Sequence, residues 1–468
     1  CPVILPGSSS RVAPGSTSRR PPEITTPGRL AEEKPIALDE GTGPRHENAA
    51  RSLAGAPSTR YRQPDSLFEL LVPLEASGGL APVALLSGEW LLERASQVKA
   101  QGTDRQLRAK FALPHRRILE HNQPEAFLNV EQVKEMQDTR GFEPRLKVLV
   151  VSYAWLTQEH PDPFGDSLQM LAVSLERAQQ GANEQQRFPK RFAVFIDWCS
   201  LYQRGDSGRS MHEQMAFEYA LARMQLWYAH SMTSVCMLIK TPKLWVGLIR
   251  PYSDRGWPTF ERALAMLVKP SHLLGWKAVN MVGEQYSRAV PLTPAKFAEV
   301  LKEKVFTSVR ADEELVVRLY AETFAEVIGG AQTLEFDQAN GANYNSANWG
   351  DAEVVELATQ VLPYCRCLQK LDLWYNNIGD DGVAVLAKNG LSTLSSLNLR
   401  YNKVGNDGFL AIATALNEGR FPCLRMLRAD LNPASQGGSG RTALIEACKI
   451  AGVQLWLEAS SDAAPTVG

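Results

Sequence analysis

Short apolar runs alternate with helical patterns of apolar residues through the middle of the chain, between residues 144 and 305. In the helical segments the apolar residues recur every three or four positions, which is typical of amphipathic helices. The apolar runs have the length of buried strands, and they lie at 146–152, 192–197, 233–239 and 276–282. This alternation predicts an α/β module with a parallel sheet wrapped by helices.

The last third of the chain contains an internal repeat. The pattern Leu-x-x-Leu-x-Leu-x-x-Asn occurs at 368–376 and 394–402, and it returns at 424–432 with Ala429 in place of the third leucine. Four spaced positions that recur together predict leucine-rich repeats, each made of a short strand and a helix. Leu334 and Phe336 indicate a degenerate first unit, and the weaker third copy is expected at a cap.

The strands of such repeats present alternate residues on a concave face. Mixed charges, with Trp374 and Arg400 expected to be exposed, suit a protein or peptide partner. The residues expected to bind it are Lys370, Asp372, Trp374, Asn398, Arg400, Arg428 and Asp430. The alternative is a solvated face without a ligand, because three short repeats make a small platform.

Composition changes sharply outside these two regions. Residues 1–64 contain ten prolines with Ser, Gly and Arg between them, which predicts a disordered arm. An organelle transit peptide is the alternative, but the acidic residues and prolines oppose it. The expected organisation is a disordered arm at 1–64, a helical lead-in at 65–143, the α/β module at 144–305, a connecting helix at 306–332, leucine-rich repeats at 333–458 and a disordered tail at 459–468.

Charge and cysteine content exclude several classes of protein. The 468 residues carry 50 Lys and Arg against 51 Asp and Glu, so the broad positive field needed for nucleic acid is missing. No apolar run approaches the ~20 residues that cross a bilayer, and no membrane partner is expected. Seven cysteines without CxxC pairs or histidines at metal-ligand spacing predict no metal site and a reducing, cytoplasmic location.

Candidate chemistry gathers in three segments of the α/β module. Ser152-Tyr-Ala-Trp155, followed by His160-Pro-Asp-Pro163, comes after the first strand, and Phe195-Ile-Asp-Trp-Cys-Ser200 ends the second. The third segment runs from Tyr252 to Glu261, with Trp257 five positions after the tyrosine and four before the glutamate. Together these segments resemble the Toll/interleukin-1 receptor (TIR) superfamily. They are similar in particular to TIR-like proteins of unicellular algae and other protists, which are often joined to leucine-rich repeats.

The resemblance implies a flavodoxin-like parallel sheet that self-associates or binds a nucleotide. TIR enzymes cleave the nicotinamide–ribose bond of NAD, so NAD is a candidate substrate, no cofactor is required, and the carboxylate that would stabilise the oxocarbenium-like state maps to Glu261. Ligands of open parallel sheets lodge outside the carboxyl ends of the strands. The candidate nucleotide-binding residues are Trp155, Asp197, Trp198, Tyr202, Arg204, Arg255 and Trp257, and Arg209 is a further candidate for the pyrophosphate.

Structural roles are the alternatives for each of these residues. An acid in the first turn of a helix opened by Pro258 is favoured by the helix dipole whether or not it touches a substrate. Asp197 can cap a loop, and the tryptophans can be core residues. Cys199 and Ser200 have no patterned His or Asp partner, which leaves a nucleophilic triad unsupported.

The sequence as a whole predicts an intracellular signalling or sensor protein, in which the TIR-like module binds nucleotide or self-assembles and the repeats recognise a protein. Whether the chain is an enzyme stays open. The alternatives are an NAD glycohydrolase, a nucleoside deoxyribosyl transferase on a related sheet, and a non-enzymatic leucine-rich-repeat adaptor.

Overall fold

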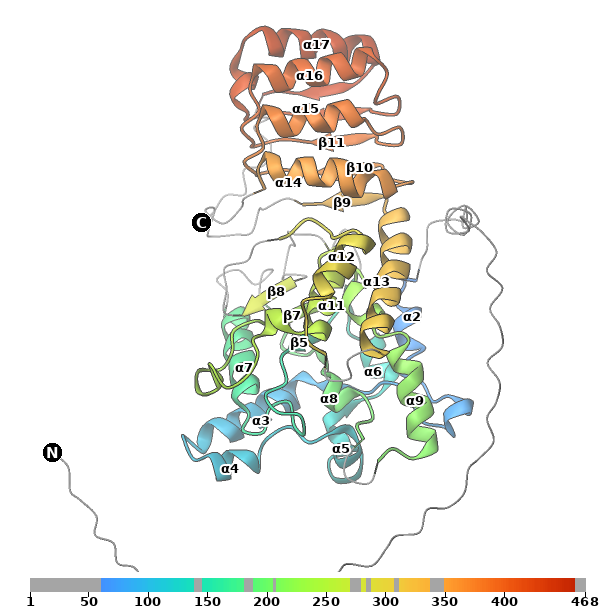
Figure 1. Ribbon diagram of the computed structural model, residues 1–468, viewed down its shortest axis with the longest axis vertical. Coiled ribbons are helices and arrows are strands. Elements are labelled where there is room, and N and C mark those ends of the chain that lie inside the picture. Colours follow the sequence, from blue (N-terminus) through green and yellow to red (C-terminus); the bar gives the residue numbers. More distant parts are fainter. Residues whose placement is uncertain are drawn as a thin grey trace, which may run out of the picture. The chain divides into compact units, whose positions relative to one another are not determined.

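A computed structural model describes residues 60–138, 145–180, 188–204, 208–269, 279–282, 288–306, 311–336 and 349–458 (Figure 1). The chain divides into two units, 1–54 and 55–468, and every described residue belongs to the second. Residues 1–59 of the arm expected at 1–64, and the tail expected at 459–468, lie outside the described residues. None of the helices in the described ranges combines the length and the hydropathy needed to cross a bilayer.

A six-stranded sheet forms the centre of the α/β module, in the order β2-β1-β6-β5-β7-β8. Its strands are β1 (Leu85–Ser87), β2 (Phe127–Leu128), β5 (Val148–Tyr153), β6 (Ala193–Phe195), β7 (Ser234–Leu238) and β8 (Val279–Val282). Strands β6, β5, β7 and β8 are parallel, whereas β1 pairs antiparallel with β6 and with β2. The four predicted strands are therefore present and parallel.

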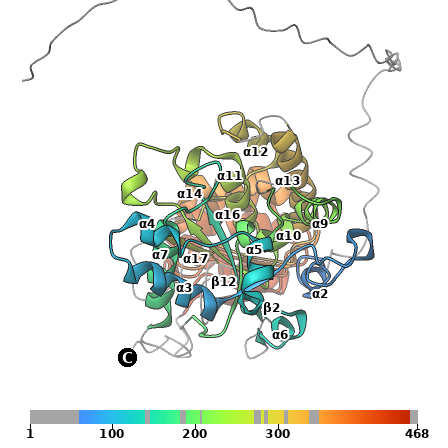
Figure 2. The same ribbon diagram turned by 90° about the horizontal axis from the view of Figure 1, so that it is seen from below.

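Helices cover both faces of this sheet, because each strand buries alternate residues on opposite sides. Leu149 and Val151 of β5 pack in one cluster with α3 (Gly88–Ala100) and α7 (Asp166–Gln179). Val148 and Val150 pack in the other with α10 (Gln225–Ala229), α11 (Gly256–Ala265) and α13 (Ala311–Gly329). Figure 2 shows the two groups of helices on opposite sides. This burial explains why β5 is a continuous apolar run rather than an alternating one.

Further helices surround this core (Figures 1 and 2). They are α2 (Asp65–Phe68), α4 (Arg105–Ala109), α5 (Arg116–Asn122), α6 (Val130–Lys134), α8 (Asp197–Ser200), α9 (Met211–Leu221) and α12 (Pro294–Leu301). A two-stranded antiparallel ribbon is formed by β3 (Gln137–Asp138) and β4 (Arg145–Leu146).

Two expectations for the N-terminal third are wrong. The lead-in is not purely helical, because it contributes β1 and β2 to the central sheet. The disordered arm cannot extend to residue 64, since Tyr61 is buried and its hydroxyl lies 3.1 Å from Oγ1 of Thr323 on α13. Arg60 beside it pairs with Glu326 on the same helix at 2.5 Å. Tertiary contacts therefore order residues that the proline-rich composition assigned to the arm.

The repeats form a second sheet of five parallel strands in the order β13-β12-β11-β10-β9. The strands are β9 (Thr333–Glu335), β10 (Lys370–Asp372), β11 (Ser396–Asn398), β12 (Met426–Arg428) and β13 (Gln454–Trp456). The helices α14 (Asp351–Glu356), α15 (Asp380–Asn389), α16 (Asn406–Asn417) and α17 (Ser439–Ala451) stack beside them (Figure 1). The predicted degenerate first unit is confirmed, because Leu334 in β9 is in register with Leu371 of β10. Strand β13 was not predicted.

Candidate functional site

Glu261 lies on α11 and points at the end of β5, inside the hydrophobic core. The hydroxyl of Ser152 donates to its Oε2 at 2.5 Å. The Ser152 hydroxyl also lies 2.6 Å from that of Tyr252, which donates to the backbone carbonyl of Pro258 at 3.1 Å. Only 6% of Glu261 is exposed. The carboxyl group therefore ends a buried chain of hydroxyl groups instead of facing an open cleft.

Burial decides the protonation state of this carboxyl group. The loss of hydration raises the pKa of Glu261 to about 8, although the hydrogen bonds of Ser152 and Tyr228 act in the opposite direction. The negative charge of Asp197 raises this pKa further. Glu261 is therefore mostly protonated at neutral pH.

Glu261 occupies the second turn of α11, because the helix begins at Gly256. The expected placement of Glu261 in a first turn opened by Pro258 is wrong.

Asp197 accepts hydrogen bonds from the last residue of β5 and from the loop that follows it. The hydroxyl of Tyr153 and Nε1 of Trp155 donate to its two carboxylate oxygens, each at 3.0 Å. The backbone nitrogen of Trp198 adds a third hydrogen bond at 2.7 Å. Burial nevertheless raises the pKa of Asp197. The structure thus brings together the predicted residues Trp155, Asp197 and Trp198, and the two indole rings meet edge to face at 5.5 Å.

A small cavity lies beside this group, lined in part by Tyr153, His160, Asp162 and Trp198. Its volume is about 20 Å³, which is room for about one water molecule. Asp162 accepts from the backbone nitrogens of Asp166 and Leu168 at the start of α7. Burial raises the pKa of Asp162 to about 7. A nucleotide needs hundreds of Å³, so this cavity does not hold one in the conformation described.

Trp257 and Arg255 make their contacts with residues outside the Asp197 group. Nε1 of Trp257 donates to Asp312 on α13 at 3.1 Å, and the ring packs on Phe260. Arg255 precedes α11 and donates through Nε to the backbone carbonyl of Arg250 at 3.1 Å. None of these contacts among the described residues joins Trp257 or Arg255 to Trp155, so a nucleotide site shared by the three stays a prediction.

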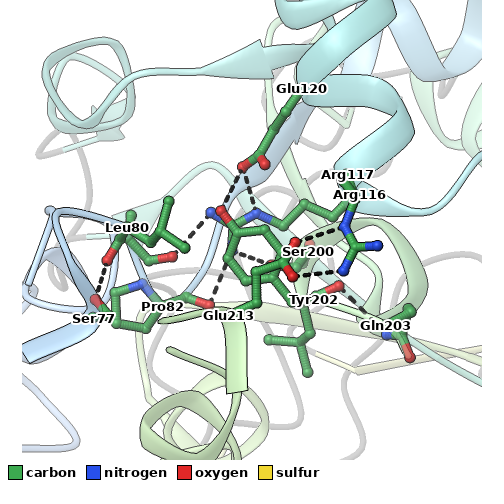
Figure 3. A network of polar contacts seen from close by, with 12 residues as sticks. Ser77, Leu80, Pro82, Arg116, Arg117, Glu120, Ser200, Tyr202, Gln203 and Glu213 are labelled. Atoms are coloured by element: carbon green, nitrogen blue, oxygen red, sulfur yellow. Dashed lines mark hydrogen bonds and ion pairs between the residues drawn. The ribbon is translucent and has the colours of Figure 1, made fainter. Parts of the chain in front are cut away.

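Tyr202, which follows α8, takes part in a separate polar network with residues of α5 (Figure 3). The guanidinium of Arg116 lies 4.0 Å from the centre of the Tyr202 ring, and the phenol donates to Glu120 at 3.1 Å. Arg209, which donates to the backbone carbonyl of Tyr202 at 2.6 Å, stacks on Phe217. Tyr202 is thus a buried structural residue, whereas Arg204 is exposed.

Two residues near the Glu261 and Asp197 groups escaped the sequence interpretation. Tyr228 on α10, whose hydroxyl donates to the backbone carbonyl of Val151 at 3.5 Å, lowers the pKa of Glu261, and Tyr153 hydrogen-bonds Asp197. Tyr153 is the second residue of the Ser-Tyr step, which offered a signal. Tyr228 falls in a buried helix after Leu226 and Trp227, where nothing in the spacing distinguishes it from core residues.

The second candidate site is the concave face of the repeats. Register places one row of side chains across the five strands: Glu335, Asp372, Asn398, Arg428 and Trp456. Neighbours in this row interact, since Nδ2 of Asn398 donates to Asp372 at 3.0 Å. Lys370 pairs with Glu335 at 3.0 Å, which leaves the β9 end of the face with mixed charge.

Aromatic and arginine side chains gather at the edge of this face. Tyr401 is 43% exposed, and the centre of its ring lies 5.5 Å from that of the Tyr375 ring. The guanidinium of Arg400 lies 5.4 Å from the centre of the Tyr401 ring. The ring of Trp374 meets Tyr375 edge to face at 6.3 Å. We call these four residues the aromatic edge. The expected exposure of Arg400 is wrong, because an ion pair of 2.7 Å with Asp430 leaves its side chain 13% exposed.

Several polar atoms on the concave face lack a hydrogen-bond partner among the described residues. They are Nε1 of Trp374, Nε of Arg428, Nε1 of Trp456 and Oδ1 of Asp430. These atoms are buried inside the chain, so they do not face the solvent side of the concave face in this conformation. In the described ranges, no group of three or more His, Cys, Asp or Glu is arranged to hold a metal ion.

Residues 364–387 and 390–413 each match the family model described as Leucine Rich repeat. These matches cover the units that contain β10 with α15 and β11 with α16. No curated protein matches the chain. Both the sequence pattern and the family model therefore identify leucine-rich repeats in this chain. Leucine-rich repeats are typical of protein-interaction surfaces.

Proposed function

We propose that this chain is a recognition protein whose leucine-rich repeats bind a protein partner through the concave face. The aromatic edge, Trp374, Tyr375, Arg400 and Tyr401, is the observation that carries the proposal. Tyrosine, tryptophan and arginine dominate the energetics of protein interfaces, because they combine large contact areas with hydrogen-bonding groups. The ordinary alternative, a solvated face, is less compatible with an exposed Tyr401 whose ring lies beside Tyr375, which in turn meets Trp374.

The exposed part of the face indicates the kind of contact. Tyr401 is 43% exposed and Met426 of β12 is 36% exposed, and both lie near the ion pairs of Lys370 with Glu335 and of Arg400 with Asp430. A protein segment with both apolar and polar side chains suits such a surface. The partner is therefore a protein segment that lies across β10 to β12.

The α/β module serves this protein as a TIR-like assembly or nucleotide-binding module. Its parallel strands follow the order second, first, third, fourth, which is that of flavodoxin-like sheets. The spacing of Tyr252, Trp257 and Glu261 that carries the resemblance coincides with a contact in space, since Glu261 meets Ser152 at the end of the first parallel strand.

An NAD glycohydrolase is the second candidate, favoured by one observation. Glu261 is a buried acid with a strongly raised pKa beside a strand end, and such groups are enriched at catalytic sites. Catalysis also requires access, and here the carboxyl group is enclosed by Ser152, Tyr228 and Tyr252. The geometry supports the recognition role better, with Glu261 as a structural acid.

The recognition role is tested by quantitative pull-down with the full chain. Trp374→Ala and Arg400→Ala should each lose a specific partner, whereas Ile450→Ala, at an exposed position of α17, and Glu261→Gln should retain it. Equal capture by all four variants and the parent would remove the concave face from the proposal.

The enzymatic candidate is tested by nicotinamide release from NAD, with the protein alone and under crowding. Glu261→Gln keeps the shape of the side chain and removes the acid, so a glycohydrolase should lose nearly all turnover. Release above background by the parent, absent in this variant, would establish the enzyme. Product analysis separates hydrolysis from deoxyribosyl transfer.

A further inference from the structure

A loop between β7 and α11 exposes three aliphatic side chains within five residues. Leu244, Val246 and Leu248 are 56%, 66% and 74% exposed. Single exposed aliphatic residues are common on protein surfaces, but a continuous group of this kind marks an interaction site. The loop belongs neither to the Asp197 group nor to the concave face of the repeats.

The loop is held in place by Trp245, which is partly buried. Trp245 donates through Nε1 to Asp166 at the start of α7 at 2.8 Å and stacks on Phe164. Arg105 on α4 lies over both rings, at 4.8 Å from Phe164 and 5.9 Å from Trp245. Asp166 is itself paired with Arg108 at 2.7 Å. Both charged and aromatic contacts therefore fix the base of the loop, while its aliphatic residues point outward.

The backbone of the loop is also internally bonded. The amide nitrogens of Leu248 and Ile249 donate to the carbonyl of Trp245 at 3.0 and 3.3 Å. Gly247 has a φ of +78°, which other residues adopt only with strain. The turn between Val246 and Leu248 thus depends on a glycine, and it places both side chains at the tip.

Positive charge surrounds the aliphatic tip. The segment from Lys240 to Ser253 contains Lys240, Lys243 and Arg250 and no acidic residue. All three basic residues are exposed, and none forms an ion pair within the described part of the chain. Asp166, the carboxylate packed against the loop, is already occupied by Arg108 and Trp245.

We propose that the loop 240–250 docks on an anionic lipid surface, with Leu244, Val246 and Leu248 entering the interface and the basic residues meeting lipid phosphates and carboxylates. Charge complementarity favours this occupant, because juxtamembrane basic residues bind anionic headgroups. The aliphatic composition favours it over a protein, since leucine and valine are under-represented at protein hot spots. No spanning helix is needed for binding in the interface plane.

The test is co-sedimentation of the full chain with vesicles of phosphatidylcholine alone or mixed with phosphatidylserine. The parent should pellet with the mixed vesicles at least about tenfold more than with phosphatidylcholine, and added salt should reduce this. Leu248→Ser and the triple variant Leu244→Ser, Val246→Ser, Leu248→Ser should weaken binding about tenfold or more. Lys243→Gln with Arg250→Gln should abolish the preference for phosphatidylserine.

The matched control is Ile450→Ser, which removes an aliphatic residue that is 71% exposed on α17. It should pellet like the parent. Failure of the parent to pellet with mixed vesicles, or equal pelleting by the loop variants, would overturn the proposal. Self-association of the parent that is lost in Leu248→Ser, without vesicle binding, would assign the loop to a protein contact instead and would also overturn it.

Discussion

Asp380, the first residue of α15, lies 2.6 Å through its Oδ1 from the backbone nitrogen of Gly405 in the next repeat. The same oxygen accepts from Gly408 at 2.9 Å, so one carboxylate binds two unpaired amides at the start of α16. Asp351 does the same for Gly379 and Gly382 at 2.7 and 2.9 Å. The repeated Gly-(Asp/Asn)-Asp-Gly step is therefore a link from each helix to the next.

Asp380→Ala should destabilise the repeats. The substitution leaves two helix-terminal N–H groups without the carboxylate, and the loss of charge-assisted hydrogen bonds costs about 1–3 kcal/mol in the free energy of unfolding. Asp381→Ala is the matched control, because this neighbour is exposed and takes no part in the link. Urea denaturation of both variants compares the two values. A similar small loss in both would show that the link adds nothing to stability.

Glu261 should make the stability of the α/β module depend on pH. Its pKa rises from an ordinary 4.5 to about 8 on folding, so the folded state holds the proton more tightly than the unfolded state. The free energy of unfolding should therefore fall as pH increases from about 4.5 to about 8, and level off above that. Asp162, with a pKa raised to about 7, adds a decrease in the same direction.

Glu261→Gln isolates this contribution. The amide is a neutral replacement for the protonated acid, so the variant should match the parent near pH 5 and melt at a higher temperature at pH 8 or above. Thermal melts over this range give the two profiles. Parallel profiles for parent and variant would mean that Glu261 is ionised in the folded protein and that burial does not control it.

The pattern of leucines and apolar runs predicted the larger elements, because the residues that an element buries must be apolar and recur with the period of that element. The runs at 146–152 and 233–239 became β5 and β7, and the leucines at 371 and 397 became in-register core positions. Strand β1 was missed because its three residues pair through β6, more than a hundred positions later, and carry no period of their own.

The candidate nucleotide site was predictable only where its members lie close together in the chain or follow strand ends. Trp155 and Asp197 meet because β5 and β6 are adjacent parallel strands. The hydrogen-bond partner of Trp257 is instead Asp312, on a helix 55 residues later in the chain. The spacing of residues within one segment cannot predict a contact with a distant helix. For the same reason it could not predict the contact between Arg116 and Tyr202 (Figure 3).

Arg116 should be among the most sensitive positions of the α/β module. Its buried guanidinium donates to the backbone carbonyls of Ala81, Pro82 and Ser200 at 2.9 to 3.2 Å. Arg116→Met keeps the length of the side chain but removes the donor from the carbonyls of Ala81 and Pro82, whereas the carbonyl of Ser200 still accepts from the backbone nitrogen of Ala84 at 3.1 Å. The loss should be about 2–4 kcal/mol.

Arg117→Met tests the adjacent position as a control. Arg117 binds Glu213 through two nitrogens at 2.6 and 2.5 Å, and its side chain is 34% exposed against 11% for that of Glu213. Glu213 keeps the hydrogen bond from the backbone nitrogen of Ser210, so the loss should be about 1–2 kcal/mol and smaller than at Arg116. Chemical denaturation measures both variants. An equal loss for the two would contradict the assignment of the carbonyl contacts as the main contribution.

The substitution Tyr401→Gly can separate the effect of this residue on stability from its effect on partner binding. Its φ of +55° is a left-handed conformation that costs a side-chain-bearing residue about 1–2 kcal/mol, and glycine adopts it freely. The extra freedom of glycine in the unfolded chain offsets part of this gain. Tyr401→Gly should therefore leave the free energy of unfolding within about 1 kcal/mol of the parent value, or raise it.

The same substitution removes an exposed ring from the aromatic edge, so partner binding should fall at least about tenfold while the fold is retained. Leu431→Gly is the matched control, because Leu431 occupies the equivalent position of the next repeat with a φ of +59° and brings no aromatic ring. Binding by titration and unfolding by urea are measured on each variant. Unchanged binding by Tyr401→Gly would place the partner elsewhere, and a large loss of stability would make the ring a structural residue. Retained stability with lost binding would instead mean that the protein keeps a strained backbone at this position because the tyrosine is needed for contact with a partner.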